Sequence, residues 1–184
     1  MSSVVLFLFI ISVSGMAALF FKRRIEETIA VVIFSVITIL YFGGMLSGSL
    51  LTGVYLCGII GIGSVLYVGR KVVKDRRNVL KLCVTPGLAI FALLFIWIVW
   101  LNANRVFSSW DEFSHWGLAV KNMDYFDYFS NHPYSTDTFS GYPPATSLWQ
   151  YFFVKLGGDF SESNVYCAGG GISSRLIFAG FKKT

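Results

Sequence analysis

The sequence predicts an all-α membrane protein, a polytopic helix bundle of about four transmembrane helices followed by an extracytoplasmic loop with short interfacial helices. Three observations predict this class. The 184-residue chain is 55% hydrophobic and has a mean hydropathy of +0.65. Only 14% of its residues are charged, whereas a soluble domain carries about 25%. The apolar residues gather in long uncharged runs, which are solvated by lipid and not by water.

Four apolar runs are the predicted membrane spans. No basic residue precedes the first run, as it would in a signal peptide, and the basic cluster 22–24 that follows it is typical of a topology anchor. The third run is rich in glycine, and small residues let a second helix approach closely, so we expect this span in the interior of the bundle. Pro86 stands in the first turn of the fourth, where proline is tolerated. The spans are Val4–Phe21, Ile29–Phe42, Leu50–Val68 and Val84–Leu101.

The distribution of lysine and arginine predicts how these spans are oriented. Three basic residues lie at 22–24 and six at 70–81, whereas the connection between the second and third spans has none. Because positively charged connections stay in the cytoplasm, we expect the N-terminus and the segment after the fourth span to lie outside the cytoplasmic membrane. The stretch 102–145 agrees, with five acidic and two basic residues. The expected regions are the four-helix membrane region 1–101, the outer loop 102–163, and a glycine-containing tail 164–184, where the chain looks truncated.

Several function classes are disfavoured by the same patterns. The net charge of +5 comes from residues beside the spans, which indicates topology and not nucleic-acid binding. Cys57, Cys83 and Cys167 have neither CxxC nor Cys/His spacing, so we expect no redox motif, no cysteine metal site and no disulfide framework. The second to fourth spans contain no ionisable Asp, Glu, Lys, Arg or His, which argues against an ion or proton transporter.

The stretch Phe107–Trp116 is the most informative segment of the outer loop. Ser109 and Glu112 fit a capping box, which predicts a helix from Trp110 to about Tyr125. Four apolar residues recur in it at three- and four-residue steps: Phe113, Trp116, Val120 and Met123. A helix with this stripe is expected to lie flat in the membrane interface, with its aromatic side chains inward.

Asp111 and Glu112 stand in the first turn of this predicted helix. The partial positive charge of a helix N-terminus favours an ionised carboxylate, which can act as a general base or bind a divalent cation such as Mg²⁺ or Mn²⁺. Structural roles compete, because capping explains Glu112 and the helix dipole explains Asp111. His115 shares a face with Asp111, although a lone histidine also fits an interfacial polar residue. Three further acids are expected to be solvated loop charges: Asp124, Asp127 and Asp137.

The segment from Tyr142 to Pro144 is a second marker, because two prolines impose an extended turn and end any preceding helix. It is interpreted either as a stiff lead into a membrane segment or as a rigid wall of an active site. Trp110 and Trp116 are read as membrane anchors and, alternatively, as sugar platforms. The apolar run 145–156 is shorter than the roughly 20 residues of a span, so we expect it in the interface or at the start of a re-entrant segment.

Together, Trp110–Trp116, Tyr142–Pro144 and Gln150–Phe153 resemble the first portion of polytopic glycosyltransferases of the GT-C type. The resemblance implies a large multi-span, inverting enzyme that uses a sugar carried on polyprenyl phosphate. In that family an acidic residue in an outer loop, just after a transmembrane helix, deprotonates the acceptor hydroxyl. The match places this role on Asp111 first and on Glu112 second, and some members bind a divalent metal nearby.

The same resemblance implies that three residues bind substrate: His115, Trp116 and Tyr142. The chain departs from the family, because its acidic loop follows the fourth span and not the first, and because it has fewer spans. We therefore expect a membrane glycosyltransferase-like protein, either a portion of a complete enzyme or an inactive fragment. The alternative is a non-catalytic membrane subunit or assembly partner that packs through the small residues of its third span.

Overall fold

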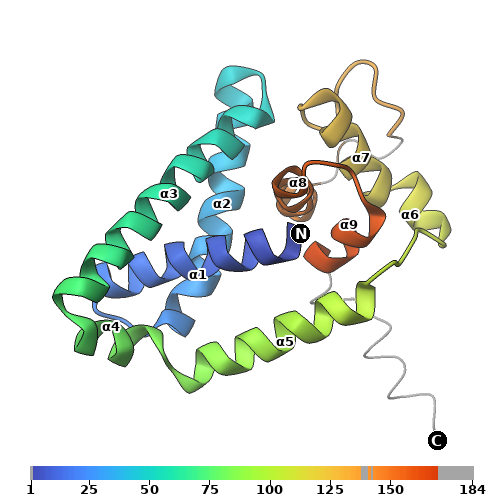
Figure 1. Cartoon of the computed structure of the whole chain (residues 1–184). Helices are drawn as coiled ribbons and strands as arrows, with labels where there is room; N and C mark the ends of the chain where they lie inside the picture. The colour runs from blue at the N-terminus through green and yellow to red at the C-terminus, as the bar shows by residue number, and fades with distance from the viewer. Residues whose placement is uncertain (1, 138–140, 142, 170–184) are drawn as a thin grey trace, which may run out of the picture.

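The computed structural model describes residues 2–137, 141 and 143–169, and every regular element in them is a helix (Figure 1). This confirms the predicted all-α class. The helices are α1 (Ser2–Phe21), α2 (Ile25–Ser47), α3 (Leu50–Lys74), α4 (Arg76–Cys83), α5 (Pro86–Asn102), α6 (Trp110–Ser114), α7 (Trp116–Phe126), α8 (Ala145–Gly157) and α9 (Glu162–Gly169).

Within these described residues, α1, α2 and α3 are each long and apolar enough to cross a membrane. A fourth crossing results if α4 and α5 form one broken span, since the two helices meet at a bend of 57°. The chain is therefore a helical membrane protein with three to four candidate spans, as the sequence predicts. The bend falls after the basic helix α4, and Thr85 caps the start of α5 by accepting a hydrogen bond from the Leu88 N–H.

Helix α2 continues through Gly43 and Gly44, beyond Phe42, where the predicted second span ends. A Cβ atom at Gly43 would lie 3.0 Å from the backbone nitrogen of Gly53. Gly43 and Gly53 therefore let the backbones of α2 and α3 come into contact. The turn is confined to Gly48, whose φ of 72° is in the left-handed region, and Ser49, whose hydroxyl caps α3.

The expected interior position of the third span is wrong for the residues that the structure describes. Helix α3 packs through one narrow face, on which residues of small or moderate size recur every three or four positions: Gly53, Cys57, Gly61 and Ser64. Its other side is open, with Tyr55 and Ile59 each 67% exposed and no atom within 4 Å of a Cβ built at Gly58. Helix α3 therefore lies at the edge of the bundle.

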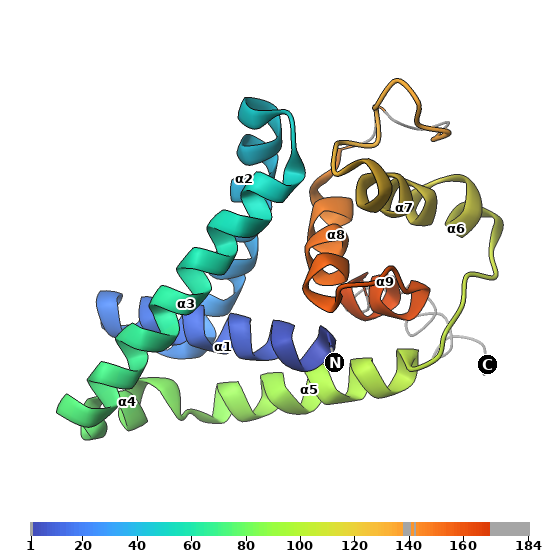
Figure 2. The ribbon, with the colours of Figure 1, turned by 45° about the horizontal axis from the view of Figure 1, so that its top comes forward.

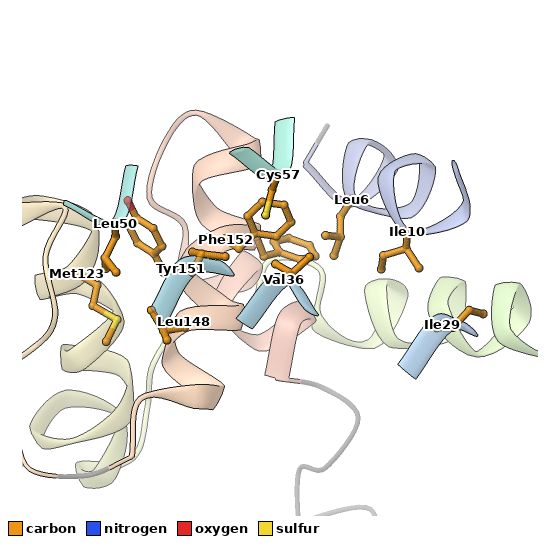
Figure 3. Close-up of a cluster of buried hydrophobic side chains, with 12 residues drawn as sticks. Leu6, Ile10, Ile29, Val36, Leu50, Cys57, Met123, Leu148, Tyr151 and Phe152 are labelled. Carbon is orange, nitrogen blue, oxygen red and sulfur yellow. The ribbon is translucent and has the colours of Figure 1, made fainter. Parts of the chain in front are cut away.

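The main hydrophobic core joins the membrane helices to the helices that follow α5. Helix α8 is at its centre, and its Tyr151, Phe152 and Phe153 are fully buried. They pack on side chains of the first three helices, among them Leu6, Ile10, Val36 and Cys57 (Figure 3). The apolar run that was expected in the interface or in a re-entrant segment is thus enclosed by the protein's own helices.

The two ends of the membrane helices differ in charge. A second core cluster joins the end of α1 to α4 through Ala18, Leu19 and Val79, so the basic connections at 22–24 and 70–81 gather at one end. At the opposite end the Leu50 N–H donates to the Asp127 carbonyl oxygen, 2.7 Å away. Helices α6 to α9 lie at this second end, beside the N-terminus of α1 and the end of α5 (Figure 2).

Candidate functional site

The segment between α5 and α6 is fastened by α9. The backbone N–H of Phe107 donates to a carboxylate oxygen of Glu162 over 2.6 Å, and the Ser163 hydroxyl donates to the Asn102 carbonyl oxygen over 2.8 Å. The Arg105 guanidinium lies 4.1 Å from the centre of the Tyr166 ring, within the range of a cation–π contact. These contacts fix the direction in which the chain enters α6.

Glu112 is a structural carboxylate at the start of α6. It is only 5% exposed, and its Oε2 accepts hydrogen bonds from the N–H groups of Ser108 and Ser109 at 2.5 and 2.6 Å. The predicted capping box is confirmed. Burial alone would raise the pKa of Glu112, but hydrogen bonds from the Tyr166 hydroxyl and from both amides outweigh it and lower that pKa. This environment favours the capping interpretation of Glu112.

Asp111, by contrast, is exposed to solvent in the first turn of α6. The two neighbouring acids therefore differ in environment, because Glu112 is buried and Asp111 is on the surface. No group of three His, Cys, Asp or Glu residues that could hold a metal ion occurs among the described residues. Because Glu112 is saturated with protein donors, Asp111 and Glu112 by themselves do not fit a divalent metal site.

The continuous helix predicted from Trp110 to Tyr125 is broken at His115. Its φ of −133° and ψ of −104° end α6, and α7 starts at the next residue. The break comes with a close approach two residues later: a Cβ atom at Gly117 would lie 2.7 Å from the Phe107 ring and still nearer the Glu112 carbonyl oxygen. The chain folds tightly onto the start of α6 here, and only glycine fits.

The break also divides the predicted apolar stripe. Val120 and Met123 of α7 are buried, as expected, and Trp116 is half-buried. Phe113, however, lies on α6 before the break and is 58% exposed. Val120 and Met123 therefore face α8, whereas Phe113 lies on the surface.

A cavity of about 250 Å³ lies between α7 and the start of α8. Its lining includes His115, Trp116, Asp137 and Pro144. Two of the predicted substrate-binding residues are thus brought together, but Asp111 and Glu112 do not line the cavity. The third, Tyr142, lies outside the described residues.

The acidic residue in this cavity is one that sequence reasoning treated as a solvated loop charge. Asp137 stands in the same lining as His115 and Trp116, so the cavity combines a carboxylate, an imidazole and an indole. No pattern in the sequence connects Asp137 with the earlier motif, because a whole helix and a loop separate them. Only the folding of the 127–137 segment across α7 brings them into one cavity.

A charged cluster between α7 and α8 was also missed. The Lys155 ammonium lies 2.7 Å from Asp127 and 3.1 Å from Asp124, and the Tyr151 hydroxyl donates to Asp127 over 2.8 Å. The expectation that both acids are solvated loop charges is therefore wrong. Burial lowers the pKa of Lys155, but its hydrogen bonds to the two carboxylates outweigh burial and raise it. The available signal was a lone lysine inside an apolar run, which requires a partner when buried.

Comparison of the chain with family models, with curated proteins and with solved structures finds no match.

Proposed function

We propose that the chain belongs to a membrane glycosyltransferase-like protein, which transfers a sugar from a polyprenyl-phosphate donor to an acceptor outside the cytoplasmic membrane. The observation that carries this proposal is the cavity lined by His115, Trp116 and Asp137 at one end of the membrane helices. Sugar sites combine apolar or aromatic walls with a few convergent polar groups. A cavity of this make-up, placed where the spans end, suits the sugar of a substrate whose lipid portion stays in the bilayer.

The proposed orientation puts α6 to α9 outside. Its support is the gathering of the connections 22–24 and 70–81 at the opposite end of the bundle, since loops rich in lysine and arginine remain in the cytoplasm. Labelling of single introduced cysteines with an impermeant maleimide tests it. Asn104→Cys should react in intact cells, whereas Asp75→Cys should react only after lysis, and the reverse pattern would exclude the orientation.

The proposed general base is Asp111. Its carboxylate takes the proton of the acceptor hydroxyl as that oxygen attacks the anomeric carbon of the sugar. The bond from this carbon to the phosphate oxygen breaks, polyprenyl phosphate leaves, and the anomeric configuration inverts. Asp111 is chosen over Glu112 because it is exposed and available, whereas Glu112 is held by backbone amides. Asp137 is the competing carboxylate, because it lines the cavity.

The test is transfer of labelled sugar from a polyprenyl-phosphate donor in isolated membranes. It compares Asp111→Asn, Asp137→Asn and Glu112→Gln, each in this chain and in the longest reading frame that contains it. Loss of a general base lowers turnover by roughly 10²–10⁴-fold, and we expect that loss for Asp111→Asn with insertion unchanged. A loss confined to Asp137→Asn would move the base to the cavity. Absence of transfer in every form would favour the non-catalytic membrane subunit.

A further inference from the structure

A second cavity adjoins the first. It has a volume of about 360 Å³ and lies between the end of α2 and the segment 128–131. Ser130 and Pro144 line both cavities, so the two are neighbours that share a wall at these residues. Together they fall in the size range of roughly 300–1,000 Å³ that is typical of small-molecule sites.

The second cavity faces the membrane side of the protein. Tyr41 and Met45, which line it, belong to the candidate span α2, and Met45 is 60% exposed. The next residue, Leu46, is 85% exposed and lines neither cavity. One side of this cavity therefore lies on the surface of α2, which is the surface that a crossing helix presents to the bilayer.

The walls of the second cavity are firmly built. The ring of Phe129 packs edge-on against Tyr41, with 5.6 Å between ring centres. A Cβ atom at Gly44 would lie 3.0 Å from the Phe129 ring, so glycine at this position lets the ring seat on α2. Ser130, at the junction of the two cavities, is only 7% exposed. The wall formed by α2 and the segment 128–131 is thus made of packed side chains and not of a free loop.

The polar groups of both cavities are mostly uncharged. They include the side chains of Tyr128, Asn131, Thr146 and Ser147, and among the described lining residues Asp137 alone is acidic. No lysine or arginine occurs among the described residues that line either cavity. Lipid phosphates are bound by lysine and arginine, whereas hydroxyl groups pair with neutral donors and acceptors and with carboxylates.

We infer that the two cavities form one site for the uncharged, hydroxyl-rich headgroup of a glycolipid, which enters sideways from the outer leaflet past Tyr41 and Met45. This inference rests on the proposed function, in which such a glycolipid is the acceptor. Its sugar occupies the cavity of His115 and Trp116 with the reacting hydroxyl directed out of the cavity towards Asp111, and its hydrocarbon chains remain beside α2. The phosphate of the donor is then held by residues outside these two cavities.

Photo-crosslinking tests the route without any need for catalysis. The whole chain, with an aliphatic diazirine amino acid of methionine's size at Met45 or at Leu46, is placed in phosphatidylcholine vesicles that contain either tritiated monoglucosyldiacylglycerol or tritiated phosphatidylglycerol. A headgroup held by one or two hydrogen bonds binds roughly tenfold more tightly than an unheld one. We therefore expect about tenfold more glycolipid than phosphatidylglycerol to be captured at Met45, and no such preference at Leu46. Equal capture of the two lipids at Met45, or a preference for the anionic one, would overturn the inference.

A second measurement separates this inference from the proposed activity. Met45→Trp narrows the membrane-side cavity, and Leu46→Trp places a tryptophan on the neighbouring exposed position. If sugar transfer occurs and only Met45→Trp slows it, by about tenfold at limiting glycolipid, both proposals hold. If both variants transfer equally, the route is wrong although the activity stands. If capture at Met45 is selective but no form transfers sugar, the glycolipid site stands and the activity fails.

Discussion

Replacement of Glu112 by alanine is expected to unfasten the segment that joins α5 to α6. The carboxylate accepts hydrogen bonds from the Ser108 and Ser109 amides at 2.5 and 2.6 Å, and from the Tyr166 hydroxyl. A hydrogen bond to a charged group contributes about 1.5–3 kcal/mol. Water replaces some of these bonds once α6 frays, so we expect a net loss of about 3 kcal/mol. At about 1.4 kcal/mol per factor of ten, local opening becomes roughly a hundredfold more frequent.

Hydrogen exchange followed by mass spectrometry measures this opening directly, on peptides that cover 103–114. Asp111→Ala is the matched control, because Asp111 is the neighbouring acid in the same turn and is exposed. A surface substitution changes stability by about 0.5 kcal/mol, which is roughly a twofold change in exchange. If the two variants exchange alike, Glu112 is not the residue that holds this segment, and the capping argument fails.

The stability that the Glu112 carboxylate provides depends on pH, and its direction follows from the pKa of Glu112. The pKa of Glu112 is lowered from its ordinary value of 4.5 in the folded protein. The stability that Glu112 provides is therefore complete above about pH 4.5 and is lost as the pH falls through the lower, folded-state pKa. After correction for intrinsic exchange rates, acid should weaken protection of the 103–114 peptides in the native chain. Glu112→Gln should remove this response.

Two further substitutions test the packing. Lys155→Met removes the counter-charge of Asp124 and Asp127, so we expect a loss of about 2 kcal/mol in thermal unfolding in detergent, and native-like stability would contradict the pairing. Gly53→Ala should destabilise the chain by about 1–3 kcal/mol, because its Cβ would lie 2.7 Å from the Leu40 Cα, whereas Gly58→Ala meets nothing within 4 Å and should be neutral. Equal unfolding temperatures of the two alanine variants would exclude the close contact of α2 and α3.

The features that the sequence predicts well are those that depend on local composition. A long uncharged run in lipid must satisfy its own backbone hydrogen bonds, so the spans follow from hydropathy alone. The capping box is likewise local, since Ser109 and Glu112 are three residues apart. Both features are set within one helix and are independent of what packs against it.

The features that were missed depend on residues far apart in the chain. The break at His115 arises where Gly117 meets Phe107, and no helical periodicity contains that contact. Similarly, Lys155 finds its acidic partner Asp127 only because α7 and α8 lie side by side. Glu112, unlike Asp111, also accepts a hydrogen bond from Tyr166 of α9, and no local pattern connects Tyr166 with α6.

The unequal lengths of the membrane helices place a demand on the surrounding bilayer. Helix α5 has 17 residues, which at 1.5 Å per residue span about 26 Å, whereas a hydrocarbon core is about 30 Å thick. Helix α3 has 25 residues, but its end is basic, and its uncharged part 50–69 spans about 30 Å on the same rise. Where α5 provides the apolar part of the fourth crossing, this mismatch is relieved by local thinning of the lipid beside it. The protein should therefore be more stable in bilayers of shorter acyl chains, and lipid thickness becomes a variable that any reconstitution has to control.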